Sequence, residues 1–206
     1  MLTTPNEELV RAACKKFDED NGPIEEALDE LFRRYRDNSA LNHVLPKVAT
    51  LNALYSTQIP VYGKTIPNVV DVAKHICAIG HDIDAALLAG SPEIVDKIAT
   101  IKVPEKKPRN YFSFATKYCS WHNPLCYPMY DSSVHQYLRW LRRRGEFATD
   151  FDLEGHWGYP AFRDLMSSFR ERYCPSFSFK DIDKFLWLYG EGQQLDSVSS
   201  CVAVAS

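Results

Sequence analysis

The segment FSFATKYCSWHNPLCYPMYDSSV, residues 112–134, contains the strongest candidates for functional side chains in this sequence. It combines a helix-like stretch containing Lys117, a loop interrupted by prolines, and Asp131 followed by two serines. Aspartate is a favoured N-cap because its carboxylate accepts hydrogen bonds from the free amides of a first helical turn. We therefore expect Asp131 to begin a helix over 132–144, and we expect the short connection to bring it near Lys117.

Apolar residues recur at helical spacing through most of the chain, and strand-like alternation is nearly absent. Besides 132–144, helices are predicted near residues 24–35, 44–55, 69–76, 91–101, 110–121, 158–172 and 179–189. Ser178 and Asp181 have the spacing of a capping box, and Gly22-Pro23 reads as a break. The sequence predicts an all-α fold of about eight to ten short helices.

Length and composition suit one globular domain. The chain has 206 residues, of which 45% are hydrophobic and 25% charged, so it can bury a core and is not composed like a disordered protein. We expect a single compact domain over 1–190, made of two closely joined lobes with a cleft between them. Residues 191–206 are small and polar, which predicts a flexible C-terminal tail.

Cysteine usage and hydropathy indicate an intracellular protein. The six cysteines are scattered without a CxxC pair, which fits a reducing compartment, and no Cys/His pattern implies a metal. Neither a signal peptide nor a run of about 18 apolar residues is visible. We expect a cytoplasmic or nucleoid-associated protein that uses no cofactor and contacts no membrane.

Positive charge is concentrated in two places, although the formal net charge is −3. Lys102, Lys106, Lys107 and Arg109 lie in one connection between predicted helices, and a second cluster, 139–144, lies at a helix end. The arginines of the second cluster can form a solvated face that interacts with the helix C-terminus. A basic hairpin between helices can contact phosphates, so any nucleic-acid surface must be local to it.

Three segments resemble the helix-hairpin-helix DNA glycosylase superfamily, in particular its branch with the 8-oxoguanine DNA glycosylase (OGG)-like fold. LNALYSTQI, residues 51–59, is similar to the helix end and polar loop that this family wedges into a duplex. Residues 91–118 occupy the place of the helix-hairpin-helix, and YPMYDSSV, residues 127–134, looks like the loop that delivers the catalytic aspartate. The closing segment 179–192 is similar to the last helix of relatives in that branch.

The resemblance implies a two-lobed helical DNA-glycosylase-like fold with a degenerate helix-hairpin-helix. It also implies a monomer whose partner is duplex DNA containing a damaged or modified base. Asp131 would be the catalytic carboxylate, because cleavage of an N-glycosidic bond develops positive charge on the sugar. Lys117 would contact the extruded base or pair with Asp131 rather than act as a nucleophile.

The family's usual nucleophilic lysine falls near Arg109 and Asn110 in this sequence. Arginine cannot serve as an amine nucleophile because its pKa is above about 12, although Lys107 stays open as a substitute. The resemblance therefore implies a monofunctional N-glycosylase with weak or no lyase activity.

A glycosylase must extrude its target base, hold it between apolar surfaces and fill the vacated space. On the resemblance, the filler is Gln58 with Ser56 and Thr57. The candidate pocket walls, any of which can also be ordinary core residues, are Phe114, Tyr118, Trp121, His122, Phe185 and Trp187.

The hairpin KVPEKKPRN, residues 102–110, departs from the family pattern. It lacks the glycines of the LPGVG-type turn, and its two prolines remove amide donors. Three functions therefore stay open: a DNA N-glycosylase, a non-catalytic DNA- or protein-binding module that keeps the fold, and an all-α enzyme acting on a free nucleobase or nucleoside.

Overall fold

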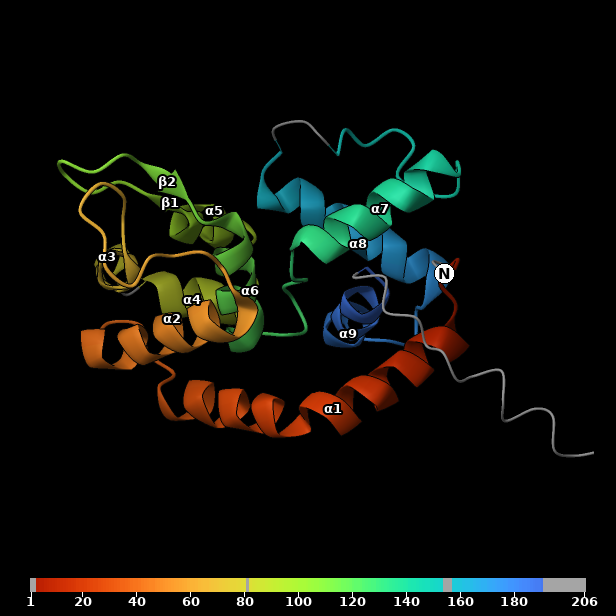
Figure 1. Cartoon of the computed structure of the whole chain (residues 1–206), viewed down its shortest axis with the longest axis horizontal. Helices are drawn as coiled ribbons and strands as arrows, with labels where there is room; N and C mark the ends of the chain where they lie inside the picture. Colours follow the sequence, from red (N-terminus) through yellow and green to blue (C-terminus); the bar gives the residue numbers. More distant parts are fainter. Residues whose placement is uncertain (1–2, 81, 154–156, 191–206) are drawn as a thin grey trace, which may run out of the picture.

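The computed structural model describes residues 3–80, 82–153 and 157–190, and this part of the chain is almost entirely helical (Figure 1). Its helices are α1 (Glu7–Arg34), α2 (Leu41–Tyr55), α3 (Val69–Ile79), α4 (Asp82–Ala89), α5 (Glu93–Ala99), α6 (Phe112–His122), α7 (Ser132–Arg143), α8 (Tyr159–Tyr173) and α9 (Phe179–Gly190). The strands β1 (Thr100–Ile101) and β2 (Arg109–Asn110) form an antiparallel hairpin between α5 and α6. The all-α prediction is confirmed, and the predicted tail 191–206 lies outside the described residues.

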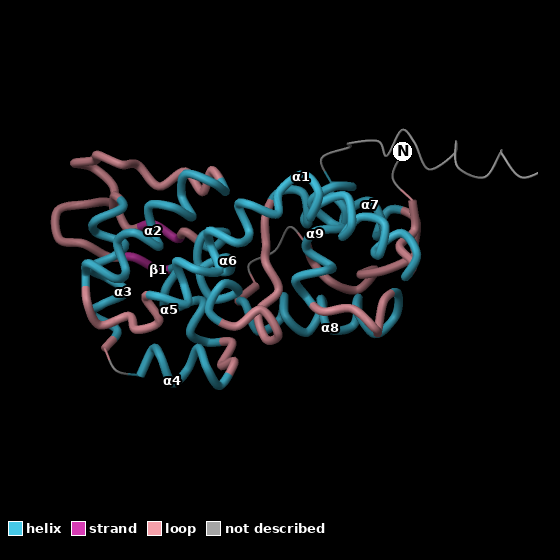
Figure 2. Tube along the Cα trace, turned by 90° about the horizontal axis from the view of Figure 1, so that it is seen from below, coloured by secondary structure: helices cyan, strands magenta, loops and turns pink. Residues whose placement is uncertain are grey.

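The helices form two groups, with α1 running along both (Figures 1 and 2). Helices α2 to α6 and the hairpin make up the first lobe, and α7 to α9 make up the second lobe. Helix α1 packs against α9 of the second lobe and against α6 of the first. The lobes also meet where α5 contacts α8. The connection from α6 to α7 therefore crosses from one lobe to the other. It links Lys117 of α6 to Asp131 at the start of α7.

Helix α1 is longer than the sequence predicted, because it continues through Gly22-Pro23. A proline inside a helix removes one backbone hydrogen bond and crowds the preceding turn. Buried residues lie on both sides of this point, with Val10 in the first half and Phe32 in the second. Burial of both halves against the core compensates for the lost bond, and the predicted break was wrong.

Helix starts follow the capping chemistry of their first residues. The predicted capping box of α9 is confirmed, since the Asp181 amide donates to Ser178 Oγ and the Ser178 amide donates to Asp181 Oδ2. Asp131 caps α7, as predicted. Helix α4 was not predicted, because eight residues between two glycines give too short an apolar pattern. Helix α5 is shorter than predicted because Thr100 and Ile101 leave it to form β1.

The first turn of α7 lies against the end of α9. A Cβ atom at Gly190 would lie 2.5 Å from the carbonyl oxygen of Ser133, so only glycine permits this approach. Ser133 is the second residue of α7, next to the capping Asp131. The position of the α7 N-terminus is therefore set partly by the missing side chain at 190.

We predict that Gly190→Ala lowers the free energy of unfolding by about 1–3 kcal/mol, because the added methyl group collides with backbone rather than with a movable side chain. Gly22→Ala is the matched control. Nothing lies within 4 Å of a Cβ at Gly22 in the middle of α1, so this change should stabilise the protein by about 0.5–1 kcal/mol. Urea unfolding of both variants tests this, and equal effects of the two substitutions would contradict it.

Candidate functional site

Lys117 and Asp131 lie together at the crossing between the lobes, as the sequence predicted. The Lys117 ammonium is buried in α6, and its Nζ lies 3.5 Å from Asp131 Oδ2. The same Nζ donates hydrogen bonds to the Tyr130 carbonyl at 2.9 Å and to Ser113 Oγ at 3.1 Å. Three acceptors thus match the three N–H groups of the ammonium, which fixes its position.

The two carboxylate oxygens of Asp131 have different partners. Oδ1 accepts hydrogen bonds from the amides of Ser133 and Val134, both at 3.0 Å, and so caps α7. Oδ2 faces Lys117. The predicted capping role and a chemical role are therefore compatible, because each uses a different oxygen.

A cavity of about 650 Å³ opens beside this pair. Its lining includes the predicted filler residues and residues around Lys117 and Asp131. The lining residues are Tyr55, Ser56, Thr57, Gln58, Ile66, Arg109, Asn110, Tyr111, Phe112, Ser113, Phe114, Asp131 and Ser132. Asp131 thus shares one cavity with Gln58 and with Phe114. These residues come from α2, from the hairpin and from both sides of the connection between the lobes.

The loop 56–58 at the cavity is held in a strained shape. Ser56 and Gln58 have φ angles of 49° and 61°, in the left-handed region that side chains other than glycine seldom adopt. Asn52 supports this shape, because its Oδ1 accepts hydrogen bonds from Thr57 Oγ1 and from the Ile59 amide. Strained backbone of this kind persists only where its surroundings fix it, and it is common at binding sites.

Tyr55 and Asp183 belong to the site but were not expected from the sequence. The Tyr55 ring lines the cavity with its centre 5.5 Å from Lys117 Nζ, and its hydroxyl accepts a hydrogen bond from Trp121 Nε1. Asp183, from α9, is half-buried. Burial, and then the nearby Asp131 carboxylate, raise the pKa of Asp183 to about 7. The helical spacing of α9 gave no signal for this, because the neighbours of Asp183 are distant in sequence.

The other predicted pocket walls lie elsewhere. Tyr118 and His122 face a separate buried cluster around Lys47, described below. Phe185 is a core residue packed on Tyr137 and Tyr189. Trp187 packs edge-on against Phe17 of α1. Trp121 does not line the cavity, and reaches it only through its hydrogen bond to Tyr55.

The four residues predicted to bind phosphates lie in different surroundings. Lys106 binds Asp71 Oδ2 at 2.5 Å and the Gly63 carbonyl at 3.1 Å, so its charge is used inside the protein. Its role as a phosphate contact stays a prediction. Lys102 lies on a shallow hollow away from the cavity. Arg109 lines the cavity itself. Lys107 bonds to the Thr65 carbonyl through its backbone amide, which leaves its side chain unengaged.

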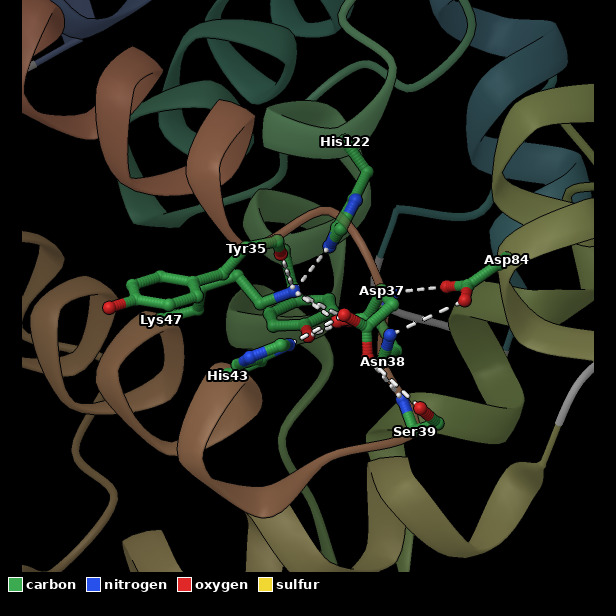
Figure 3. Close-up of polar contacts among 9 residues, drawn as sticks. Tyr35, Asp37, Asn38, Ser39, His43, Lys47, Asp84 and His122 are labelled. Carbon is green, nitrogen blue, oxygen red and sulfur yellow. Dashed lines mark hydrogen bonds and ion pairs between the residues drawn. The ribbon is translucent and has the colours of Figure 1, made fainter.

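A second buried lysine, Lys47, forms the centre of a polar cluster at the other end of α6 (Figure 3). Its Nζ donates to the Tyr35 carbonyl at 2.8 Å and to Asn38 Oδ1 at 2.7 Å, and lies 3.2 Å from His122 Nε2. Tyr118 also donates to Asn38 Oδ1. Burial, and then the Lys47 charge, lower the pKa of His122 to about 3, so this histidine is neutral.

The Lys47 cluster closes the C-terminal end of α1. The Tyr35 carbonyl belongs to the residue that ends this helix, and Asn38 lies in the turn to α2. Burial lowers the pKa of Lys47 to about 8. Lys47 belongs to α2, its hydrogen bonds reach the turn at the end of α1, and its Nζ also contacts His122 of α6. The cluster therefore joins α1, α2 and α6 as a structural unit.

Two further features of the described part of the chain are relevant to the site. No helix within residues 3–80, 82–153 and 157–190 combines the length and apolar character that crossing a bilayer requires. In the same ranges, no three His, Cys, Asp or Glu side chains are grouped as the ligands of a metal ion would be.

Similarity to known proteins places the chain in a family. Residues 9–126 match the family model HI_0787_N, described as an N-terminal domain. The chain belongs to this family. A Haemophilus influenzae relative, itself called an uncharacterized protein, is 33% identical over 155 residues, which are 75% of this chain and 70% of the relative. No solved structure matches the chain. The HI_0787_N region contains Lys47 and Lys117, whereas Asp131 and Asp183 lie beyond it.

We predict that Asp183→Asn removes a pH dependence of stability. A carboxyl group whose pKa is higher in the folded protein stabilises the fold at low pH, and this contribution is lost as the pH rises through the folded pKa. The wild type should therefore lose stability between about pH 4 and 7 relative to Asp183→Asn, with a difference on the order of 2 kcal/mol at pH 8. Urea unfolding from pH 4 to 8 measures this, with Asp164→Asn on the exposed face of α8 as control. A difference that does not change with pH would rule it out.

We predict that Lys47→Met lowers the free energy of unfolding by about 2–4 kcal/mol at pH 7, because the Tyr35 and Asp37 carbonyls would lose the hydrogen bonds that Lys47 Nζ donates to them. Since the folded-state pKa of Lys47 is below its unfolded value, wild-type stability should also rise relative to Lys47→Met between about pH 8 and 10. Lys15→Met, at an exposed position of α1, should change stability little. Denaturant midpoints measure all three, and a Lys47→Met protein as stable as the wild type would contradict the structural role.

Proposed function

We propose that this protein is a monofunctional DNA N-glycosylase that excises a damaged or modified base, with Asp131 as its catalytic carboxylate. One observation carries the proposal above the others. Asp131, paired with buried Lys117, lies on the wall of a cavity of about 650 Å³ that also contains the strained loop 56–58. Cavities of a few hundred cubic ångströms hold small organic groups such as a nucleobase.

The chemistry that this arrangement supports is hydrolysis of the bond between base and sugar. Water adds to the anomeric carbon, the base departs with the bonding electrons, and positive charge develops on the sugar during this exchange. A fixed carboxylate stabilises that charge or accepts the proton of the attacking water. The Oδ2 atom of Asp131, which faces Lys117 and not the amides of α7, is the oxygen suited to this role, since Oδ1 is occupied by two amides of α7.

The surroundings of Lys117 support a positioning role and not covalent chemistry. A lysine nucleophile must present a free neutral amine to the sugar. The Lys117 Nζ instead has three acceptors, from Ser113, Tyr130 and Asp131. Arg109, at the place of the superfamily's usual nucleophile, cannot act as one. These features favour base excision without strand cleavage.

A non-catalytic module that binds DNA or a protein is the second candidate, and the hairpin favours it. Its turn contains no glycine, and Lys106 is paired with Asp71. A hairpin of this superfamily usually contacts phosphate through backbone amides. Here any phosphate contact would have to come from side chains. Salt dependence distinguishes the two partners, because DNA affinity falls steeply with salt and most protein affinities do not.

We predict that purified protein releases a base from at least one member of a panel of duplexes carrying oxidised, deaminated or bulky modified bases. Heating in alkali then cuts the strand at the abasic site. Asp131→Asn should lower the excision rate by at least about 100-fold, while the helix stays capped because asparagine is an equally good N-cap. Borohydride should trap no protein–DNA adduct.

Asp164→Asn is the matched control, since this exposed residue of α8 lies outside the site. No alkali-sensitive scission across the panel would contradict the proposal. Equal excision by the wild type and a folded Asp131→Asn variant would contradict the role of Asp131.

A further inference from the structure

Tyr62 is a large aromatic residue held almost fully in water. It is 91% exposed, and its neighbour Val61 is 55% exposed. Both belong to the loop 60–67 between α2 and α3, which lies beside the hairpin in Figure 1. The apolar face of such a ring gains free energy when a partner covers it.

The loop that carries Tyr62 is held by hydrogen bonds at three of the residues that follow the ring. The Gly63 carbonyl accepts a hydrogen bond from Lys106 Nζ at 3.1 Å, and the Thr65 carbonyl accepts one from the Lys107 amide at 2.9 Å. Tyr111 Oη donates to the Pro67 carbonyl at 2.7 Å. The exposed ring is therefore presented by a supported loop, which lowers the entropy lost when a partner covers it.

The loop of Tyr62 and the adjacent hairpin carry several cations that form no ion pair with a described acidic side chain. Lys64, on the same loop, forms no ion pair with a described residue, and neither do Lys107 or Arg109 of the hairpin. Within the described part of the chain, the acidic side chain that pairs with this hairpin is Asp71, and it binds Lys106. The hairpin's own carboxylate, Glu105, offsets one of these charges. An exposed aromatic ring among free cations is the combination that binds the bases and phosphates of an unpaired strand.

The same loop also reaches the cavity. Ile66 of this loop and Arg109 of the hairpin both line it, so this part of the loop forms one edge of the rim, with Tyr62 four positions before Ile66. A strand whose target base occupies the cavity would continue over this rim.

We propose that Tyr62 stacks on an unpaired nucleobase of the DNA strand that enters the cavity, while Lys64 and Lys107 contact its phosphates. The choice of DNA as the ligand rests on the proposed function; the stacking itself requires no catalysis. The surface is distinct from the loop 56–58, whose residues line the cavity, whereas Tyr62 does not.

The test uses the full chain carrying Asp131→Asn, so that binding is read without turnover. The probe is a duplex with one bulged 2-aminopurine, whose fluorescence falls when the base stacks on a ring. Adding Tyr62→Ala should weaken binding by about 5- to 100-fold and restore the fluorescence, whereas Tyr62→Phe should do neither. Leu88→Ala, which removes an equally exposed apolar side chain from α4, should leave both signals unchanged.

Unchanged affinity and unchanged quenching in Tyr62→Ala would overturn the inference. So would an equal loss in Leu88→Ala, or loss of affinity without recovery of fluorescence. Failure of the proposed function has a different signature. Binding that depends on Tyr62, in a protein that never produces alkali-sensitive sites, would support the stacking surface and overturn the glycosylase. Excision at the same rate by the wild type and Tyr62→Ala would support the glycosylase and overturn the stacking surface.

Discussion

The ion pair between the buried Lys117 ammonium and Asp131 joins the two lobes. Lys117 belongs to α6, the last helix of the first lobe, and its partners Tyr130 and Asp131 lead into α7, the first helix of the second. A buried cation that loses its acceptors costs several kcal/mol, so the α7 N-terminus is held against α6. The cavity beside Asp131 depends on this attachment and on the absence of a side chain at Gly190.

Two buried lysines connect α6 to neighbouring helices: Lys117 from α6 itself, and Lys47 from α2. Lys117 binds groups at the start of α7, and Lys47 binds groups at the end of α1 beside His122, the last residue of α6. Lys47 satisfies the Tyr35 carbonyl, one of the groups that the C-terminal end of a helix leaves without an intrahelical partner, and Lys117 satisfies the Tyr130 carbonyl ahead of α7. Burial also drives Lys47 and Asp183 toward their neutral forms. Only Asp183 lies near the cavity, where a group that titrates near neutral pH is suited to proton transfer.

Local patterns predicted most of the fold, and long-range contacts account for what they missed. Helical spacing and caps located α7 and α9, and the short connection from Lys117 to Asp131 was enough to predict their approach. The break expected at Pro23 failed because packing on both sides outweighs a local penalty. Tyr55 and Asp183 could not be found from spacing, since α2 and α9 reach the site only in the folded chain. The ion pair of Lys106 could not be found from spacing either, because its partner Asp71 is 35 residues away.

A double-mutant cycle on the free energy of unfolding tests the connection between Lys117 and Asp131 most directly. The cycle compares wild type, Lys117→Met, Asp131→Asn and the double variant at pH 7, and asparagine preserves the cap so that only the charge pairing is removed. If the two groups act as one unit, the double variant should be more stable than the sum of the single losses implies, by about 1–3 kcal/mol. Losses that simply add would show that the buried amine and the capping acid are independent, and would contradict the site described for this protein.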